Sequence, residues 1–459
     1  MNPAMEELPY DTEDLICALA TPWASSALAV IRTTGAGCVD AFSLFFSRPR
    51  ALSTAPGHTA LHGTVLDSAG QPLDEVVATV FRAPSSSTGQ ETVELSCHGS
   101  LPGLRRILDT LAAGGFRPAN PGEFTLRAFL NGKLDLTRAE AVQELVAART
   151  DRAQALALDR LSGSVADRIT AIKTKVVDFV ALLNIQLDYA EDDVPTAGVP
   201  FEVLDAVREE LRELAASYRT GKIYQEGVRV ALAGRTNAGK SSLFNLFLKE
   251  DRSIVSEEPG TTRDWLEAWV SLDGVPLRLV DTAGLRETES AVEREGIRRS
   301  RELIDGCEVL LYLVDGTLGA VDEDRAFLDA HAADPRLVTV FTKRDLVDRP
   351  TPPPDGTVWV SSKTGAGFAD LEAAIQARLP GTGEGTPGGA VIDSLRQKQL
   401  LDRAVAALAQ VRMGTELGAP IDMIALDVRE ALDALGEITG EVTTADVLTR
   451  MFSSFCVGK

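Results

Sequence analysis

The sequence predicts a multidomain protein of α/β and all-α parts, in which a doubly wound α/β domain is inserted into a helical bundle. Strand-like and helix-like segments alternate near the N-terminus. Apolar residues recur at helical spacing over 137–219, and this pattern resumes over 391–450. Short apolar strands and glycine-rich loops lie between the two helical stretches. The predicted domains are 1–130 (α/β), 131–224 with 384–459 (helical bundle, parts 1 and 2) and 225–383 (inserted domain).

The composition limits the classes of protein to which the chain can belong. Its 459 residues include 46 Lys plus Arg and 67 Asp plus Glu, a formal net charge of −21. We expect no long basic surface for duplex nucleic acid, although a local basic patch that contacts RNA is not excluded. The five cysteines are far apart, which indicates a reducing compartment rather than a disulfide framework. No apolar run in the sequence is long enough to cross a membrane, so we expect a cytoplasmic protein.

The N-terminal part carries the pattern of a mixed α/β domain. Strands are predicted at 27–32, 75–81 and 92–96, and a helix is predicted at 101–111, where Pro102 suits the first turn.

Two groups of polar residues, one in this part and one in the helical part, could be read as metal or nucleophile sites, but each has a structural alternative. His98 follows Cys97 and would suit a metal or nucleophile pair, but no histidine is spaced as a partner ligand, so a structural turn is favoured. Glu191–Asp193 would suit a metal cluster, but a solvated loop is favoured.

The helical pattern itself begins at a predicted capping box, Thr137-x-x-Glu140.

A phosphate-binding loop is the most specific feature of the sequence. Alternating apolar residues over 228–232 predict a buried strand that runs into Gly234–Ser241, a G-x-x-x-x-G-K-S sequence followed by an apolar helix. In such a loop, backbone N–H groups turn toward phosphate oxygens, and the helix directs its positive N-terminus at them. Lys240 would contact the β- and γ-phosphates, and Ser241 would ligate Mg²⁺. A chance glycine-rich turn is the alternative, but the flanking strand and helix favour a nucleotide site.

The segments that follow this loop indicate which nucleotide binds. A hairpin with an Asp-Gly turn is predicted over 269–280 and ends on Asp281-Thr282-Ala283-Gly284, the D-x-x-G sequence of GTPases. After further strands comes Thr342-Lys343-Arg344-Asp345, an N-K-x-D sequence with Thr in place of Asn. Asp345 can pair with the guanine N1–H and 2-amino groups, which adenine lacks, and Ser361-Ser362-Lys363 supplies a loop over the base. The order of these segments predicts a Ras-like, doubly wound P-loop GTPase domain.

Several sequences give the chain a family resemblance. Gly260–Asp264, Asp281–Arg286 and Phe455–Lys459 together resemble the MnmE (TrmE) family of tRNA uridine-modification GTPases, of the TrmE/Era-like P-loop class. Pro121–Thr125 and Phe129–Leu136 extend the resemblance to nearly the whole chain. It implies K⁺-dependent GTP hydrolysis in the 5-carboxymethylaminomethyl or aminomethyl modification of the tRNA wobble uridine. It also implies a homodimer whose G domains pair, and a flavin-dependent MnmG-type partner that forms a heterotetramer with it.

The resemblance also assigns the hydrolysis site. Leu285 follows the D-x-x-G sequence, so the water-orienting glutamine of Ras-like enzymes is missing. The resemblance gives this role to Glu293, for which an exposed helix carboxylate is the alternative, beside Lys240 as the other catalytic residue. It assigns Mg²⁺ to Ser241 and Thr262, and K⁺ to Asn237, Ser256, the Glu258 carbonyl and Thr261. The residues expected to bind GTP are Asn237, Ala238, Gly239, Lys240, Ser241, Ser242, Ser256, Thr261, Thr262, Asp281, Thr282, Ala283, Gly284, Thr342, Lys343, Asp345, Ser361, Ser362 and Lys363.

For the N-terminal domain, the resemblance implies dimerisation and a 5-formyl-tetrahydrofolate site. The matching folate contacts are Arg32, Glu94, Lys133 and Lys459. The sequence departs from the family pattern at Pro22–Ser26 and at Thr88–Glu91, close to this site. Cys456 in the tail is either a reactive thiol near the folate or a packed cysteine.

Two other functions stay open at the level of sequence. A ribosome-assembly GTPase would carry a KH-type RNA-binding appendage, and the flanks of the GTPase domain show no G-x-x-G sequence in that context. A regulatory or scaffold GTPase without folate chemistry is compatible with the altered Pro22–Ser26 loop.

Overall fold

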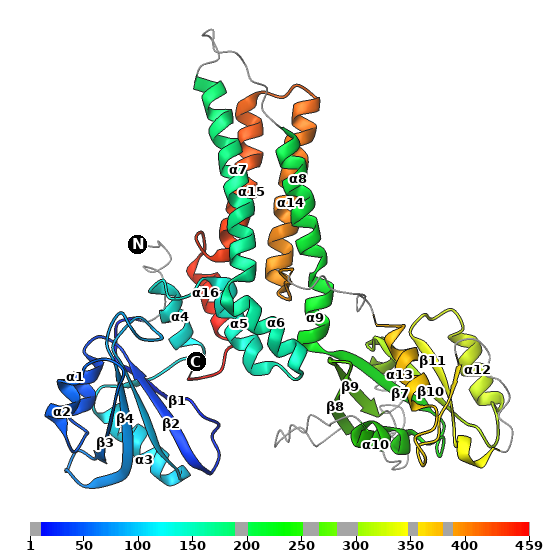
Figure 1. Cartoon of the computed structure of the whole chain (residues 1–459), viewed down its shortest axis with the longest axis horizontal. Coiled ribbons are helices and arrows are strands. Elements are labelled where there is room, and N and C mark those ends of the chain that lie inside the picture. Colours follow the sequence, from blue (N-terminus) through cyan, green and yellow to red (C-terminus); the bar gives the residue numbers. More distant parts are fainter. Residues whose placement is uncertain are drawn as a thin grey trace. The chain divides into compact units, whose positions relative to one another are not determined.

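The computed structural model describes residues 11–188, 201–250, 266–281, 302–347, 357–379 and 389–458 (Figure 1). Its contacts divide the chain into two compact units, each assembled from separated segments. The first unit takes Met1–Gln143, Arg160–Leu211 and Gln399–Lys459, and the second takes Glu144–Asp159 and Arg212–Lys398. The fold class predicted from the sequence is confirmed, since α/β sheets and a helical bundle are both present. None of the described helices is long and apolar enough to cross a membrane.

The first unit begins with a six-stranded sheet in the order β3-β4-β5-β2-β1-β6. Its strands are β1 (Ile16–Leu19), β2 (Ser26–Thr34), β3 (Thr59–Leu66), β4 (Pro72–Phe81), β5 (Thr92–Gly99) and β6 (Arg117–Pro118). All pairs are antiparallel except β1 with β6. Its helices are α1 (Cys38–Ser43), α2 (Pro49–Ser53) and α3 (Leu101–Ala113). Every second residue of β4 and β5 is buried beneath α3, whose Leu104, Ile107 and Leu111 recur on one helical face. The strands and the helix predicted here are confirmed.

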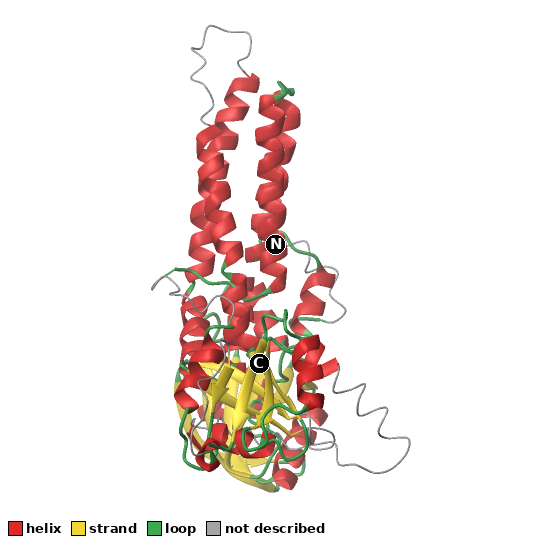
Figure 2. Cartoon of the chain, turned by 90° about the vertical axis from the view of Figure 1, so that its right-hand side faces the viewer, coloured by secondary structure: helices red, strands yellow, loops and turns green. Residues whose placement is uncertain are grey.

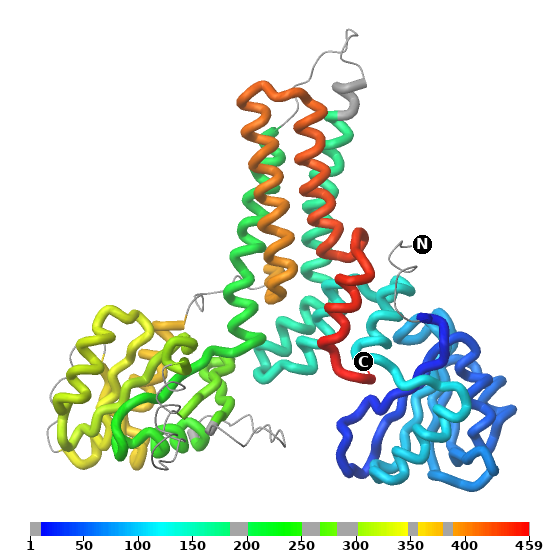
Figure 3. Tube along the Cα trace, turned by 180° about the vertical axis from the view of Figure 1, so that it is seen from behind, coloured from blue at the N-terminus to red at the C-terminus, as the bar shows by residue number. Residues whose placement is uncertain are grey.

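The helices of the bundle come from distant parts of the sequence, and those at 151–159 and 218–226 belong to the second unit. The chain forms α4 (Glu123–Leu130), α5 (Leu136–Ala147), α6 (Asp151–Ser162), α7 (Ser164–Asp188), α8 (Phe201–Ala216), α9 (Tyr218–Glu226), α14 (Leu395–Glu416), α15 (Ile421–Thr439) and α16 (Ala445–Phe452). α7 lies beside α15, and α8 lies beside α14 (Figure 1 and Figure 3). Arg412 of α14 pairs with Asp205 of α8 at 3.1 Å, and Lys175 of α7 pairs with Glu210 of α8 at 2.5 Å. Figure 2 shows that the long part of this bundle consists of helices alone.

One predicted helix start is wrong. α5 begins at Leu136, so Thr137 lies inside the helix rather than at its cap. The Asp135 carboxylate accepts from the backbone N–H groups of Thr137 (2.9 Å) and Arg138 (3.1 Å). Asp135 therefore caps the helix, because its carboxylate accepts from two N–H groups of the first turn that have no partner within the helix.

The second unit contains a six-stranded sheet in the order β12-β11-β10-β7-β9-β8. Its strands are β7 (Val228–Gly234), β8 (Leu266–Leu272), β9 (Val275–Asp281), β10 (Val309–Asp315), β11 (Leu337–Thr342) and β12 (Thr357–Trp359). Its helices are α10 (Lys240–Glu250), α12 (Asp322–Ala330), the 3₁₀ turn η3 (Arg344–Leu346) and α13 (Phe368–Gln376). Only β8 is antiparallel, and it turns into β9 at Asp273 (φ 47°) and Gly274 (φ 80°), the positive φ values that a tight hairpin requires.

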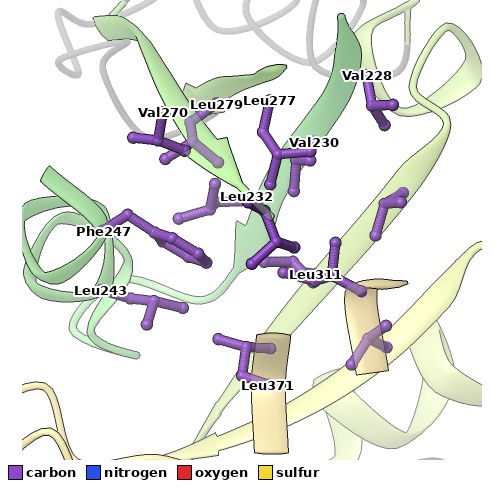
Figure 4. Packing of buried hydrophobic residues seen from close by; sticks show 14 of the residues in the cluster. Val228, Val230, Leu232, Leu243, Phe247, Val270, Leu277, Leu279, Leu311 and Leu371 are labelled. Atoms are coloured by element: carbon purple, nitrogen blue, oxygen red, sulfur yellow. The ribbon is translucent and has the colours of Figure 1, made fainter. Parts of the chain in front are cut away.

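An apolar core fixes the phosphate loop in this unit (Figure 4). Val228, Val230 and Leu232 of β7 are fully buried and pack with Leu243 and Phe247 of α10. Strand β7 and helix α10 flank the loop, so their burial holds both ends of the loop in place.

Candidate functional site

The phosphate loop owes its shape to three residues with positive φ. Gly234 has φ 137°, and an added Cβ would lie 2.4 Å from the Leu313 carbonyl oxygen of β10, so only glycine fits. Gly239 has φ 93°, and Asn237, a residue type that tolerates this region, has φ 63°. The loop joins the carboxyl end of β7 to the N-terminus of α10 at Lys240, the place where a doubly wound sheet binds phosphates.

Lys240 lies inside this loop and is only 6% exposed. Its Nζ donates to the carbonyl oxygens of Gly234 (2.6 Å) and Arg235 (2.8 Å). Burial lowers the pKa of Lys240, and the charge of Asp281 partly opposes this effect. The ammonium group therefore lies inside the phosphate loop, and phosphate oxygens of a bound nucleotide would replace the two carbonyl oxygens as its acceptors.

Ser241 and Asp281 meet beside the lysine. The Ser241 hydroxyl donates to Asp281 Oδ2 at 3.3 Å. Asp281 is 1% exposed and ends β9, whose pairing places it opposite Leu232 of β7. A hydroxyl and a carboxylate oxygen are hard ligands of the kind that Mg²⁺ prefers, so these two residues fit that ion.

Thr342 joins the predicted guanine loop to the phosphate loop. It ends β11, is buried, and its Oγ1 lies 2.8 Å from the Ala238 carbonyl oxygen and 3.2 Å from that of Val314. Both partners are acceptors and a hydroxyl has one proton, so the Thr342 proton is committed to the protein.

Lys343 and Asp345 follow on the same turn. Lys343 has φ 57°, and its Nζ pairs with Asp315 Oδ2 at 2.5 Å. Ser361, fully buried, donates to Asp345 Oδ1 at 2.6 Å, and this hydrogen bond lowers the pKa of Asp345. Asp345 itself is exposed and ionised, as a carboxylate that accepts from guanine must be.

Asp315 is a member of this site that the sequence motifs did not indicate. It ends β10 between two strands whose carboxyl ends carry predicted site residues, and this position could have identified it.

The described residues bring together Lys240, Ser241, Asp281 and the Ala238–Thr342 pair, while Asp345 and Ser361 form the adjoining guanine loop. The remaining predicted positions Ser256, Glu258, Thr261, Thr262, Thr282, Ala283, Gly284, Glu293 and Lys459 lie outside the described residues.

The N-terminal sheet brings part of the predicted folate site together. Arg32 and Glu94 face each other on β2 and β5, with Arg32 Nε 2.8 Å from Glu94 Oε1. Arg32 Nη1 also donates to the carbonyl oxygen of Gly458 at 3.2 Å, so the C-terminal tail lies on this sheet. Within the part of the chain that the structure describes, no donor reaches Glu94 Oε2, and this oxygen fits a ring N–H donor such as that of a pterin. Lys133 is exposed and donates to the Pro84 carbonyl oxygen at 3.0 Å instead.

The cysteines and His98 show no nucleophilic arrangement. His98 lies on β5 rather than in the predicted turn, because its backbone pairs with β2 and Asp74 accepts from its backbone N–H. Burial raises the pKa of the neighbouring Cys97 thiol to about 11, which keeps it protonated at neutral pH. Cys456 is exposed. Among the described residues, no three His, Cys, Asp or Glu side chains are grouped to hold a metal ion.

Comparison with known families agrees with this architecture. The family model described as the MnmE helical domain matches residues 136–456, and the one described as the GTP-binding protein TrmE N-terminus matches residues 15–133. The chain belongs to the MnmE family of tRNA modification GTPases. Its resemblance to that family, predicted from the sequence, is confirmed.

Curated MnmE relatives match nearly end to end. Proteins named tRNA modification GTPase MnmE are 44% identical in Borrelia recurrentis and 41% identical in Treponema denticola, each over 98% of this chain and 99% of the relative. Among solved structures, Aquifex aeolicus Era bound to GDP and AlF4⁻ is 22% identical over 39% of this chain and 66% of Era, with a TM-score of 0.28.

Proposed function

We propose that this member of the MnmE family hydrolyses GTP in the modification of tRNA. The observation that carries the proposal is the meeting of Lys240, Ser241 and Asp281 at the carboxyl ends of β7 and β9. Asp345, held by Ser361, adds the selection for guanine. The names of the relatives, which pair GTPase activity with tRNA modification, support the second half of the proposal.

The residues divide the work as follows. Lys240 exchanges its two carbonyl partners for β- and γ-phosphate oxygens and offsets the charge that develops between them. Ser241 and Asp281 would hold Mg²⁺, which supplies further neutralisation of the phosphate oxygens. Glu293 is proposed to orient the attacking water. The backbone N–H groups of the phosphate loop surround the phosphate oxygens.

The direct test is steady-state GTP hydrolysis by Lys240→Ala and Ser241→Ala. Each variant removes a partner of phosphate or Mg²⁺, so we expect a fall of about 100-fold or more in kcat/KM, on the order of 3 kcal/mol of transition-state stabilisation. Lys249→Ala is the matched control, because Lys249 is an exposed lysine on the same helix α10. Hydrolysis at the wild-type rate by either site variant would remove the assignment.

The proposed cation at the phosphates is K⁺, held by Asn237, Ser256, Glu258 and Thr261. The exposed, left-handed Asn237 supports this role. Hydrolysis is then faster in K⁺ than in Na⁺ at equal ionic strength, and it rises with protein concentration as two G domains pair in the homodimer. Asn237→Ala abolishes the difference between the two salts while nucleotide still binds. Equal rates in both salts for the wild type would point to an arginine instead, with Arg263 and Arg286 the first to replace.

The modification itself is proposed to need 5-formyl-tetrahydrofolate and a flavin-dependent MnmG-type partner. Two tests separate this from a regulatory GTPase without folate chemistry. Titration of the folate should show binding that Glu94→Ala weakens, because the carboxylate acceptor is lost, without a change in GTP affinity. Mass analysis of wobble uridine in a deletion strain should show the unmodified base, and complementation with Lys240→Ala should not restore the modification. A modified uridine in the deletion strain would exclude this role.

A further inference from the structure

A second candidate site lies in the same unit as the phosphate loop, toward the opposite end of strand β7. A cavity of about 870 Å³ opens between the start of the α5–α6 connection, helix α9, the amino end of β7, the middle of β8 and β9, and the residue before β10. All of its lining residues belong to the second unit. Five of them are cationic: Arg149, Arg219, Lys222, Arg229 and Arg278.

The lining is positive although the whole chain carries a net charge of −21. It includes two acidic side chains, Glu226 and Glu308, and both already have donors. Glu226 lies 3.6 Å from Lys222, and Glu308 accepts from the backbone N–H of Arg229 at 2.8 Å. Glu267, outside the lining, also pairs with Arg278. The five cations still outnumber these three carboxylates, which favours an anionic ligand.

An aromatic wall holds two of the cations in position. Arg149 lies over the Trp269 ring at 4.3 Å, and Arg278 lies 5.9 Å from the same ring. Trp269 packs on Gly227, where an added Cβ would meet the ring at 2.5 Å. Arg278 is also paired with the Glu267 carboxylate, so its charge is already balanced. Arg149, held over the ring, loses little further freedom when it binds phosphate oxygens, and this prepares the wall for phosphate recognition.

The other cations are in reach of a ligand from solvent. Arg219, Lys222 and Arg229 are exposed. Within the described part of the chain, the side chains of Arg219 and Arg229 form no hydrogen bond or ion pair. A phosphate bound by them would displace no protein partner.

This cavity is separate from the nucleotide site. The phosphate loop leaves the carboxyl end of β7, whereas Val228 and Arg229 at its amino end line the cavity. Arg229 lies five residues before Gly234 on β7, and Arg278 lies three residues before Asp281 on β9, separations of about 17 Å and about 10 Å at about 3.3 Å per residue. The phosphates of a GTP in the P-loop cannot reach these cations.

We infer that this cavity binds the sugar-phosphate backbone of tRNA. The cations come from separate elements, the α5–α6 connection, α9 and strands β7 and β9, as a run of successive phosphates requires. A cavity of about 870 Å³ is much larger than a single phosphate ion needs. The inference rests on the proposed function, because it takes tRNA as the substrate.

The test measures tRNA binding by the full chain over a series of salt concentrations. The variant is Arg219→Ala with Arg229→Ala. The matched control is Lys249→Ala with Arg325→Ala, which removes two exposed cations of the same unit outside the cavity. Loss of two phosphate contacts should weaken tRNA binding about tenfold at low salt and make the slope of log K against log salt shallower by about 1.5 to 2. The control should match the wild type, and GTP hydrolysis without tRNA and the melting temperature should stay unchanged in both variants.

Each outcome decides between distinct conclusions. Equal affinity and slope in the cavity variant, the control and the wild type would overturn the cavity site while leaving the proposed function in place. A wild type that hydrolyses GTP but binds no tRNA would overturn the tRNA part of the proposed function and the cavity site with it. Binding of tripolyphosphate that is lost in the cavity variant, with tRNA affinity unchanged, would assign the cavity to a small anion and overturn the RNA site.

Discussion

At the scale of single residues, Thr342 separates this chain from the usual guanine-recognition sequence. An asparagine amide has two N–H donors, so it can bond the phosphate loop and still contact a base. The Thr342 hydroxyl has one proton, and its acceptors are the carbonyl oxygens of Ala238 and Val314. Thr342 therefore ties the phosphate loop to β10 and β11, and selection of the base rests on Asp345.

Thr342→Val tests this role, because valine keeps the shape and removes the hydroxyl. The Ala238 carbonyl oxygen would lose its donor at a buried position, a cost of about 1–3 kcal/mol. We expect GTP and GDP affinity to fall together by about tenfold in nucleotide titrations. Thr342→Ser is the control and should stay near the wild type. A valine variant with unchanged affinity for both nucleotides would show that the tie is not needed.

Asp345→Asn tests the selection of the base. An amide presents one acceptor oxygen where the carboxylate presents two, so the paired N1–H and 2-amino donors of guanine lose an acceptor. We expect weaker GTP binding and a shift of preference toward xanthosine triphosphate, which carries an acceptor in place of the 2-amino group. Competition between the two nucleotides measures the shift. A preference for GTP equal to that of the wild type would contradict the assignment.

At the scale of elements, helix α4 is fixed by a buried ionic network. Glu123 and Arg127 of α4 are fully buried, with Arg127 Nη2 2.9 Å from Glu123 Oε1. Arg117 of β6 reaches the same carboxylate oxygen at 2.7 Å, and Asp14 contacts Arg127 at 2.5 Å. The network joins α4 to the segment before β1 and to β6, and removal of one buried partner would leave the others uncompensated.

This network predicts an acid-sensitive fold. Burial raises the pKa of Glu123, but hydrogen bonds from Arg117, the Asn120 N–H and Arg127 outweigh it and bring the pKa below its usual value. The pKa of Asp14 is lowered in the same way, against its own burial. Because the pKa of the folded state is the lower one, this stabilisation is present above the unfolded value of about 4 and is lost as pH falls through the folded value.

Glu123→Gln should therefore lower the free energy of unfolding by about 3–5 kcal/mol at pH 7 and reduce its dependence on pH below about 5. Urea unfolding at several pH values measures both effects. Glu13→Gln, at an exposed position near the network, is the control. A Glu123 variant with the acid profile of the wild type would show that other carboxylates set the acid limit.

The elements differ in how far the sequence could predict them. The phosphate loop was predictable because Gly234 and Gly239 are required by its backbone and leave a fixed sequence pattern. Strands β2, β4 and β5 were predictable from their apolar residues, and strand β10 of the second sheet from its short continuous apolar run. The Asp135 cap was missed because Asp and Thr are both good caps, and only the backbone decides which one reaches the free N–H groups.

Contacts between distant segments could not be predicted from local patterns. Asp14 and Arg127 are 113 residues apart, and nothing in either neighbourhood specifies the other. The same is true of Thr342 and Ala238, 104 residues apart, whose hydrogen bond depends on the pairing of β7, β10 and β11. Sequence patterns predicted which residues carry the site, and the sheet order decides which of them touch.

At the scale of the whole molecule, the two units have separate cores and separate proposed ligands. The core that holds the phosphate loop lies in the second unit, while the core under α3 lies in the first. The predicted GTP residues belong to the second unit, and the predicted folate residues belong to the first. A ligand stabilises only the folded state that it binds, so each ligand should act on one unit.

Calorimetry should therefore show two unfolding transitions, of which GDP with Mg²⁺ raises only one. At a free concentration of about 1,000 times Kd, the bound unit gains about 4 kcal/mol, which is a shift of several degrees for a unit of this size. The Asp14–Glu123 network identifies the transition of the first unit, because Glu123→Gln should lower that transition and not the one that GDP moves. Lys240→Ala should abolish the nucleotide shift and leave both transitions in place. A single transition that both Glu123→Gln and GDP move would show that the two units unfold as one.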